Sequence, residues 1–340
     1  MRLSRAIAAA AASTLMLLAA GCSSGSDATN KNNPAPIEKV TYSTGFGQFG
    51  REAYVYVGIE KGYFKDVGIE VTVKPGAGTG DNLKLLTTGN VDFTPVDFTG
   101  AMIQVGGGKV QGVTAVAAIH QRTLACIMTL DGRGITSPKD LEGKTVGDPN
   151  GSTIGLMFPT YAKLAGIDAS KVKFVNIAAP QLPSTLAAGT VDTIGQFVVG
   201  VPTIEKAAGG KKAVVLPYSD FINDVYGNVL TTTTKLAQQK PDLVKKFAAA
   251  LLKSLQYAVD HPEEAGQILH KAVPAQDATV AAGELTLMKQ YVNSSGSGAA
   301  IGALDQQRVA RSIALMQGAN AIPAGLTPER LVSFDLTPKA

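Results

Sequence analysis

The chain has 340 residues, of which 45% are hydrophobic and 17% are charged. This length and composition suit one large or two ordinary globular domains and exclude a mostly disordered protein. The net charge of +4 is too small to indicate nucleic-acid binding, and two cysteines are too few for a disulfide scaffold.

The first 21 residues have the pattern of a secretory signal. Arg2 and Arg5 supply positive charge, and the mostly apolar run at residues 6–20 is too short for a comfortable membrane span. The run ends at Gly21 and Cys22. We therefore expect residues 1–21 to be a signal peptide and the protein to be exported.

The end of this segment, LLAAGC, resembles a bacterial lipobox, although Ala19 stands where an aliphatic residue is usual. The resemblance implies lipidation of Cys22 and a stable anchor on the outer face of the bacterial cytoplasmic membrane. The alternative is an ordinary secretory signal with an incidental cysteine. Residues 22–36 are polar and poor in apolar side chains, which predicts a flexible tether outside the fold.

Residues 53–97 follow the order helix, strand, glycine-rich turn, helix, strand. Valine and threonine mark the strand at 69–73, Thr79 can cap the helix that stops at Gly89, and residues 91–94 fit the next strand. This alternation predicts a mostly parallel sheet that binds ligands at the carboxyl ends of its strands.

Three turns follow the first three predicted strands and carry groups suited to a ligand. The first turn, residues 44–51, places three glycines around two aromatic residues, a glutamine and an arginine. Its rings can stack on a ligand or simply cover the sheet, and its arginine can equally be solvated. The threonines of the other turns can hold a polar ligand, cap helices, or do both. The predicted contacts are Phe46, Gln48, Phe49, Arg51, Thr79, Asp97 and Thr99.

A strand at 113–119 is followed by three polar residues that can contact a ligand, namely His120, Gln121 and Arg122. The histidine and the arginine can pair with an anionic group. Alternatively, the histidine binds a backbone carbonyl and the arginine faces solvent. Cys126 lies in an apolar strand and is expected to be a buried, inert thiol.

The pattern repeats in the next hundred residues. A strand at 144–147 leads into a polar turn and a helix at 154–164. The turn can cap that helix, and its glycine permits close approach of backbone donors to a ligand. Later strand ends and helix starts supply further polar and aromatic groups. The predicted contacts are Asn150, Gly151, Ser152, Thr153, Gln181, Gln196, Tyr218 and Tyr226.

From residue 241 onward the apolar residues follow helical spacing, as at Phe247, Leu251 and Leu255. We expect helices that cover the first domain. No metal-ligand spacing, nucleophile motif or phosphate-binding loop occurs, so we expect no cofactor, no metal site and no enzymatic activity.

Three motifs carry a resemblance to a family. They are EKGYFKDVGIEV with LTTGNVDF between residues 60 and 93, GITSPKDLEGKTVG at 134–147, and LAAGTVDT at 186–193. Together they resemble solute-binding proteins of ABC importers for nitrate, sulfonates, taurine and thiamine pyrimidine precursors. The similarity covers residues 37–212 and, more loosely, the helical remainder.

The resemblance implies an α/β, two-lobed, type II periplasmic-binding-protein-like fold. Each lobe would be a five-stranded, mostly parallel sheet flanked by helices, with two hinge crossings. Lobe I would comprise residues 37–119 and 230–339, and lobe II residues 123–226. A solute held between the lobes would stabilise their closed state.

The expected function is capture of a small polar or heteroaromatic solute, similar to a thiamine pyrimidine precursor, for an ABC permease. The expected protein is a monomer that binds no nucleic acid. Arg51, Arg122 and the turn at residues 150–153 favour an anion, which leaves an alkanesulfonate, taurine or nitrate as the alternative. A sensor lipoprotein that presents its ligand to a receptor is another. The family fold also includes pyrimidine-synthesising enzymes, but the cysteine-rich iron-binding segment of those enzymes is missing here.

Overall fold

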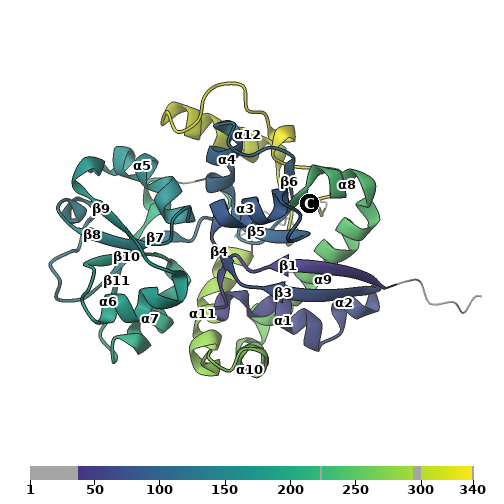
Figure 1. Ribbon diagram of the computed structural model, residues 1–340, viewed down its shortest axis with the longest axis horizontal. Coiled ribbons are helices and arrows are strands. Elements are labelled where there is room, and N and C mark those ends of the chain that lie inside the picture. Colours follow the sequence, from purple (N-terminus) through teal and green to yellow (C-terminus); the bar gives the residue numbers. More distant parts are fainter. Residues whose placement is uncertain (1–36, 223, 294–299, 339–340) are drawn as a thin grey trace, which may run out of the picture. The chain divides into compact units, whose positions relative to one another are not determined.

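The structure is a computed structural model that describes residues 37–222, 224–293 and 300–338. The predicted signal peptide, Cys22 and the tether lie outside the described residues. Within the described part of the chain, no helix combines the length and the apolar character needed to cross a membrane. The described residues form two five-stranded sheets with helices around them (Figure 1).

The first sheet has the strand order β3-β1-β5-β12-β6. β1 runs parallel to β3 and β5, whereas β12 pairs antiparallel with both β5 and β6. Four strands therefore point one way and only β12 is reversed. The strands are β1 (Glu38–Ser43), β3 (Ile69–Lys74), β5 (Phe93–Asp97), β6 (Val113–Ala118) and β12 (Asn228–Thr233).

The second sheet has the order β11-β7-β10-β8-β9. β7 is antiparallel to β11 and β10, while β10, β8 and β9 are parallel. Again a single strand is reversed. The strands are β7 (Ala125–Leu130), β8 (Thr145–Asp148), β9 (Lys173–Asn176), β10 (Thr193–Phe197) and β11 (Ala213–Pro217).

The expected five-stranded α/β architecture is confirmed, with mixed sheets in which most strands share one direction. The reversed strands β7 and β12 are the first strands that the chain enters after it passes from one sheet to the other. The sequence pattern located both strands. It did not give their directions, because a buried apolar strand has the same pattern in either direction.

Helices lie beside both sheets (Figure 1). α1, α2, α9 and α10 pack together next to the first sheet, and α5, α6 and α7 contact strands of the second. The helices are α1 (Ala53–Glu60), α2 (Tyr63–Asp66), α3 (Thr79–Thr87), α4 (Phe98–Gly106), α5 (Thr153–Ala165), α6 (Leu182–Ala187), α7 (Val201–Ala207), α8 (Thr234–Gln239), α9 (Pro241–Asp260), α10 (Pro262–Ala272), α11 (Ala278–Val292) and α12 (Gln306–Gly318).

Aromatic stacking joins α9 to the first sheet. The Phe247 ring of α9 lies 4.2 Å from the ring of Phe93 on β5 and 5.2 Å from that of Phe64 on α2. Leu251 and Leu255 continue the same buried side of the helix. The expected cover helix therefore has its apolar side on the sheet, as its spacing predicted.

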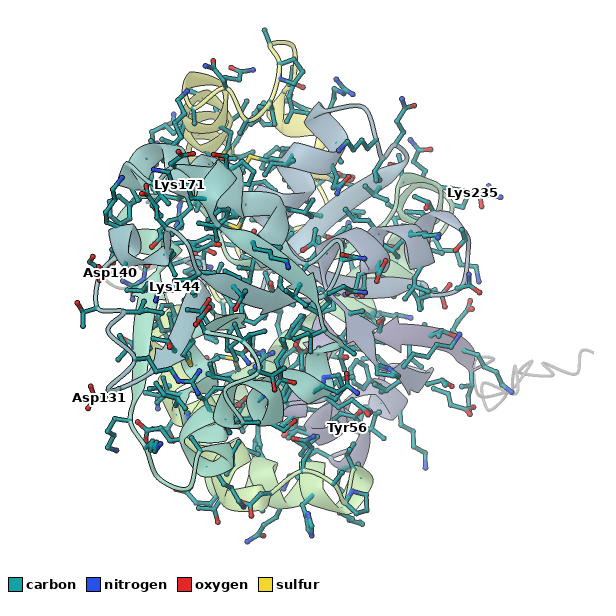
Figure 2. All side chains as sticks on the ribbon, turned by 60° about the vertical axis from the view of Figure 1, so that its left-hand side comes forward. Tyr56, Asp131, Asp140, Lys144, Lys171 and Lys235 are labelled. Carbon is teal, nitrogen blue, oxygen red and sulfur yellow. The ribbon has the colours of Figure 1, made fainter. Side chains whose placement is uncertain are left out.

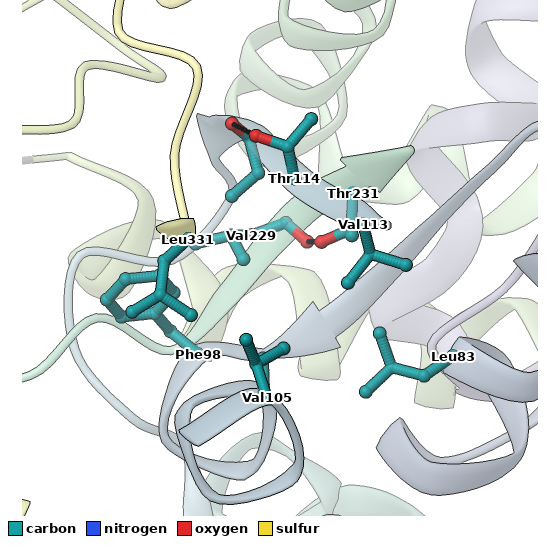
Figure 3. Close-up of a pocket in the computed structure, with 10 residues that line it drawn as sticks. Leu83, Phe98, Val105, Val113, Thr114, Val229, Thr231 and Leu331 are labelled. Atoms are coloured by element: carbon teal, nitrogen blue, oxygen red, sulfur yellow. Dashed lines mark hydrogen bonds between the residues drawn. The ribbon is translucent and has the colours of Figure 1, made fainter. Parts of the chain in front are cut away.

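A small cavity lies between α4 and the strands β6 and β12 (Figure 3). Its volume is about 10 Å³, and side chains such as Phe98, Val105 and Val229 line it. This is no larger than one water molecule requires, and the lining is mostly apolar. It is a packing defect of the core and not a ligand site.

Candidate functional site

Arg51 is a buried cation at the end of the glycine-rich turn that follows β1. The turn contains the short strand β2 (Phe46–Gly47), which pairs with β4 (Gly76–Ala77) of the next turn, and then a 3-10 turn at Gly50–Glu52. Arg51 is only 2% exposed. The sequence left open whether this residue is solvated, and the structure places it in the interior.

Three phenylalanine rings surround the Arg51 guanidinium. Its central carbon lies 5.6 Å from the ring centre of Phe46, 4.9 Å from that of Phe49 and 4.8 Å from that of Phe197. Phe197 belongs to β10 of the second sheet and packs edge-to-face on Phe46 at 5.4 Å. The ring faces attract the cation and keep water away from it.

Glu284 of α11 is the counter-charge of Arg51. The carboxylate accepts from the Arg51 backbone N–H at 3.0 Å, and its Oε2 lies 3.7 Å from Arg51 Nη1. Its other oxygen accepts from the hydroxyl of Thr203 on α7. Burial raises the pKa of Glu284, whereas Arg51 and Thr203 act to lower it. Because all of these partners donate, they favour the ionised carboxylate.

Hydrogen bonds also join the beginnings of α3 and α5, which follow strands of different sheets. The hydroxyls of Thr79 and Thr153 lie 2.7 Å apart, and the Gly80 N–H donates to the Gly151 carbonyl at 2.8 Å. Thr79 also accepts from the backbone N–H of Asp97 at 3.0 Å. The structure therefore brings together predicted contact residues from turns that follow strands of different sheets.

Four predicted contact residues have buried polar atoms that lack a hydrogen-bond partner among the described residues. They are Arg51 (Nη1), Thr99 (Oγ1), His120 (Nδ1) and Gln196 (Nε2). Buried polar groups in folded proteins are nearly always paired. These atoms are therefore candidates for binding a polar ligand or water.

His120 is a neutral member of this set. Burial lowers its pKa to about 3, and the positive charge of Arg51 contributes to the lowering. Its Nε2 lies 3.3 Å from the Met288 sulfur on α11. At neutral pH the imidazole therefore offers a hydrogen-bonding nitrogen without a charge.

A buried carboxyl stands at a strand end in each sheet. Asp97 accepts from two backbone N–H groups at the start of α4 and from the Thr123 hydroxyl at 3.2 Å, and burial raises its pKa to about 6. Asp148 accepts from the Ser152 hydroxyl and from the Gly155 N–H at 3.0 Å, and burial raises its pKa to about 7. Both carboxyls accept local hydrogen bonds at helix starts, although Oδ1 of Asp148 has no partner among the described residues.

Other predicted contacts lie near the chain crossing or the first turn. Gln48 donates to the hydroxyl of Tyr56, which is labelled in Figure 2, at 2.6 Å. Gln121 is buried, and its side chain accepts from Arg308 at 3.3 Å. Arg122 is exposed and stacks on the Tyr291 ring at 4.9 Å. These residues have protein partners of their own.

The remaining predicted contacts fall into exposed and core groups. Asn150, Gly151 and Gln181 are exposed. Tyr218 is fully buried and stacks on Tyr161 at 4.1 Å.

Tyr226 packs edge-to-face on Phe98 and lies under the Arg308 guanidinium at 4.0 Å. Like Tyr218, it belongs to a core cluster. The aromatic groups that surround a buried charged group are therefore the phenylalanines around Arg51, whereas Tyr218 packs within the core.

Sequence reasoning missed Phe197, Thr203 and Glu284. For Glu284 a signal existed, because it lies four residues before Met288 and three after Ala281, on the buried side of α11. A charge on the apolar side of a helix needs a partner. The pattern does not reveal that the partner is Arg51, 233 residues away.

Among the described residues, no group of three or more His, Cys, Asp and Glu side chains could hold a metal ion. Cys126 is fully buried, and burial raises the pKa of its thiol. Its sulfur donates to the Gln196 carbonyl at 3.3 Å. The burial that we predicted for this thiol is confirmed.

A family model described as NMT1/THI5 like matches residues 51–265, more than half of the chain. The chain belongs to the NMT1/THI5-like family. The matched region begins at Arg51 and includes Phe197 and Thr203, whereas Glu284 lies beyond its end.

Curated relatives of this NMT1/THI5-like protein include binding proteins and an enzyme. It is 24% identical to a formylaminopyrimidine-binding protein of Halalkalibacterium halodurans, over 64% of this chain and 65% of the relative. A riboflavin-binding protein of Chloroflexus aurantiacus is 25% identical over 77% and 74% of the two chains. A 4-amino-5-hydroxymethyl-2-methylpyrimidine phosphate synthase of Legionella pneumophila is 26% identical over 65% and 69%.

Solved structures share the fold at low identity. An alkanesulfonate-binding protein of Xanthomonas axonopodis pv. citri, bound to MOPS, superposes with a TM-score of 0.67 at 14% identity, over 90% of this chain and all of the other. A periplasmic nitrate-binding protein of Synechocystis gives 0.66 at 14% identity, over 88% and 87%. These likenesses place the NMT1/THI5-like chain among periplasmic-binding-protein folds.

Proposed function

We propose that this NMT1/THI5-like protein is an extracytoplasmic solute-binding protein that delivers its ligand to an ABC permease. One observation carries the proposal. Phe46 and Phe49 of the turn after β1, with Phe197 of the second sheet, surround Arg51. Buried polar atoms without a partner among the described residues lie on Arg51 itself and on Thr99, His120 and Gln196. Aromatic walls with a few oriented donors are typical of small-molecule sites.

The ligand class that we favour is a small heteroaromatic ring, similar to a thiamine pyrimidine precursor. Phe46, Phe49 and Phe197 offer ring faces and edges, and His120 adds a neutral hydrogen-bonding group. The names of the formylaminopyrimidine-binding and riboflavin-binding relatives agree with this class. An alkanesulfonate, taurine or nitrate is the alternative, because Arg51 is a cation and sulfonate and nitrate binders share the fold.

The proposed mechanism is binding and release without chemistry. We infer two lobes, residues 37–119 with 230–339 and residues 123–226, that separate in the empty protein. The bonds from Thr79 to Thr153 and from Gly80 to Gly151 would form on closure. A solute that touches both lobes favours the closed state, and that state docks on the permease. Lipidation at Cys22 would anchor the protein on the outer face of the cytoplasmic membrane.

A thermal-shift screen of the purified full chain tests the proposal. The probes are formylaminopyrimidine, riboflavin, taurine, ethanesulfonate and nitrate. A solute that binds only the folded state raises the melting temperature, and the rise grows with its concentration. A shift with either ring supports the favoured class, and a shift with ethanesulfonate or nitrate alone supports the anion class. No shift with any probe contradicts the proposal for these solutes.

A pyrimidine-synthesising enzyme is the second candidate, since two relatives bear the name of a synthase. Burial lowers the pKa of His120 to about 3, which makes it a weak base, and raises the pKa of the Cys126 thiol, which disfavours the nucleophilic thiolate. Neither residue near Arg51 is therefore well suited to acid–base or nucleophilic chemistry. Incubation of the purified chain with a bound solute, followed by mass spectrometry, separates the candidates. A binding protein returns the solute unchanged, and an enzyme forms product.

A further inference from the structure

We propose that Glu284 sets the charge selectivity of the site: it neutralises Arg51, so that the site accepts a neutral ring in preference to an anion. The inference rests on the proposed function and narrows its solute class. Glu284 was not among the contacts predicted from the sequence, and it lies outside the part of the chain that the family model matches.

The first step is the burial of both charges. The Glu284 side chain is 0% exposed and that of Arg51 is 3% exposed. A charge that is removed from water so completely needs an opposite charge close by. The 3.7 Å separation of Arg51 Nη1 and Glu284 Oε2 supplies it.

The second step is the charge balance around the guanidinium. Besides Glu284, the titratable groups whose pKa values respond to Arg51 are His120, which is neutral, the Cys126 thiol, Tyr54, and Glu52. Burial raises the pKa of Glu52. This shift favours the neutral form of Glu52, so the charge that faces Arg51 is that of Glu284. An incoming anion would therefore meet a cation that is already paired, beside a carboxylate that repels it.

The third step is that Arg51 keeps hydrogen-bonding capacity although its charge is neutralised. Nη2 donates to the Phe46 carbonyl at 3.2 Å, while Nη1 has no hydrogen-bond partner among the described residues. A neutral acceptor, such as a ring nitrogen or a carbonyl oxygen, can accept from Nη1 without a charge of its own. Three rings beside it suit a flat molecule.

The fourth step is that Glu284 is held from a second side. The Thr203 hydroxyl of α7 donates to it, and α7 also approaches α11 where Pro202 lies against Gly283. Nearby, Lys206 pairs with Asp277 across the same two helices, but both of these side chains are substantially exposed. The buried contact fixes the carboxylate, whereas the exposed pair is screened by water.

The test compares Glu284→Gln with Thr203→Val as the matched control. Glutamine keeps the size and an acceptor oxygen but removes the charge, whereas the valine removes only the α7 hydrogen bond. Dissociation constants for formylaminopyrimidine and ethanesulfonate are measured calorimetrically with the full chain. We expect Glu284→Gln to shift the ratio of the two affinities toward ethanesulfonate by about tenfold or more. We expect Thr203→Val to weaken both ligands by a similar factor.

Equal weakening of both ligands by Glu284→Gln would overturn the proposal, because a purely structural role predicts that result. If the Gln variant does not fold, Glu284→Asp replaces it. The shorter carboxylate withdraws from Arg51 and should shift selectivity the same way, to a smaller extent.

A ligand-free experiment separates failure of this inference from failure of the proposed function. Arg51→Met, Glu284→Met and the double variant form a thermodynamic cycle for unfolding. Non-additive losses show that the two residues are paired even if neither probe binds the wild type. Additive losses would refute the pairing, and with it the selectivity argument, whatever the ligand proves to be.

Discussion

Arg51 can be buried because neighbouring groups interact with the faces, the nitrogens and the charge of its guanidinium. The rings cover its faces, the Phe46 carbonyl accepts from one nitrogen, and Glu284 supplies the opposite charge. Removal of one member of a buried ion pair leaves the other charge without compensation. At the residue scale, both the stability of the fold and the ligand preference proposed for the site therefore depend on Glu284.

We expect Arg51→Met to lower the free energy of unfolding by roughly 3–5 kcal/mol, because it leaves the Glu284 charge buried without a partner. Urea unfolding measures the change. Lys235→Met is the control, since that lysine is exposed (Figure 2) and should have little effect. A loss for Arg51→Met as small as that of the control would mean that the pair does not stabilise the fold.

Asp148 should make stability depend on pH. Its pKa of about 7 in the folded state lies above the ordinary value of 3.8, so the folded protein binds the proton more tightly than the unfolded chain. The free energy of unfolding is therefore greatest at low pH for this group and falls as the pH rises through 7. Between pH 5 and pH 8 the free energy of unfolding of the wild type should fall by roughly 3 kcal/mol more than that of Asp148→Asn.

Unfolding curves at several pH values check this expectation, with Asp140→Asn as the control. Hydrogen bonds from Thr136 and Ser137 lower the pKa of Asp140, which therefore stays ionised throughout that range. The free energies of unfolding of this control and of the wild type should differ by the same amount from pH 5 to pH 8. If the difference between Asp148→Asn and the wild type is also constant over this range, the raised pKa of Asp148 is contradicted.

At the scale of elements, α11 packs between the turn that carries Arg51 and the helix α7. Its Ala281 backbone lies against Gly50, its Gly283 faces Pro202, and its Glu284 binds groups on both sides. Small residues permit this close approach, and the charged residue then fixes the two neighbours. The position of Arg51 follows from the packing of a helix more than 200 residues later in the sequence.

We expect Gly50→Ala to destabilise the protein by about 1–3 kcal/mol and to weaken solute binding. The new methyl group would collide with the Ala281 backbone, which cannot rotate away as a side chain can. Gly318→Ala is the control because nothing lies within 4 Å of that site. Thermal unfolding and the solute titration measure both effects. Equal results for the two variants would rule out close packing of Gly50 against Ala281.

Periodicity and turn chemistry predicted most elements, including β12 and the buried side of α9. The aromatic turn, the start of α5 and the buried Cys126 were also found in this way. Three features were beyond reach for physical reasons. The pattern of a buried strand does not reveal its direction. The local sequence around Tyr218 cannot distinguish a tyrosine that packs in the core, as it does on Tyr161, from one that stacks on a ligand. The partner of Glu284 is set by packing between segments that are distant in the sequence.

At the scale of the whole chain, Gly80 and Gly151 are the point where α3 meets the turn before α5. A methyl group on Gly80 would lie 2.7 Å from the Gly151 carbonyl oxygen. We expect Gly80→Ala to lower solute affinity by about tenfold while changing thermal stability little, because it disfavours only the closed arrangement.

Titration with the best solute from the screen tests this expectation, and small-angle scattering of the empty and loaded protein reports whether the variant stays more extended. Gly318→Ala again provides the comparison. Wild-type affinity in the Gly80→Ala variant would show that this contact does not accompany binding.

The reversed strand β12 has a consequence for how the chain is made. All strands of the second sheet come from one continuous stretch between Ala125 and Pro217, whereas β12 is inserted between β5 and β6, which precede it by more than a hundred residues. In a nascent chain that leaves the ribosome or the export channel amino end first, β5 and β6 must wait with unpaired edges until residue 233 emerges. The second sheet can be complete by then, so biogenesis would begin in the middle of the polypeptide.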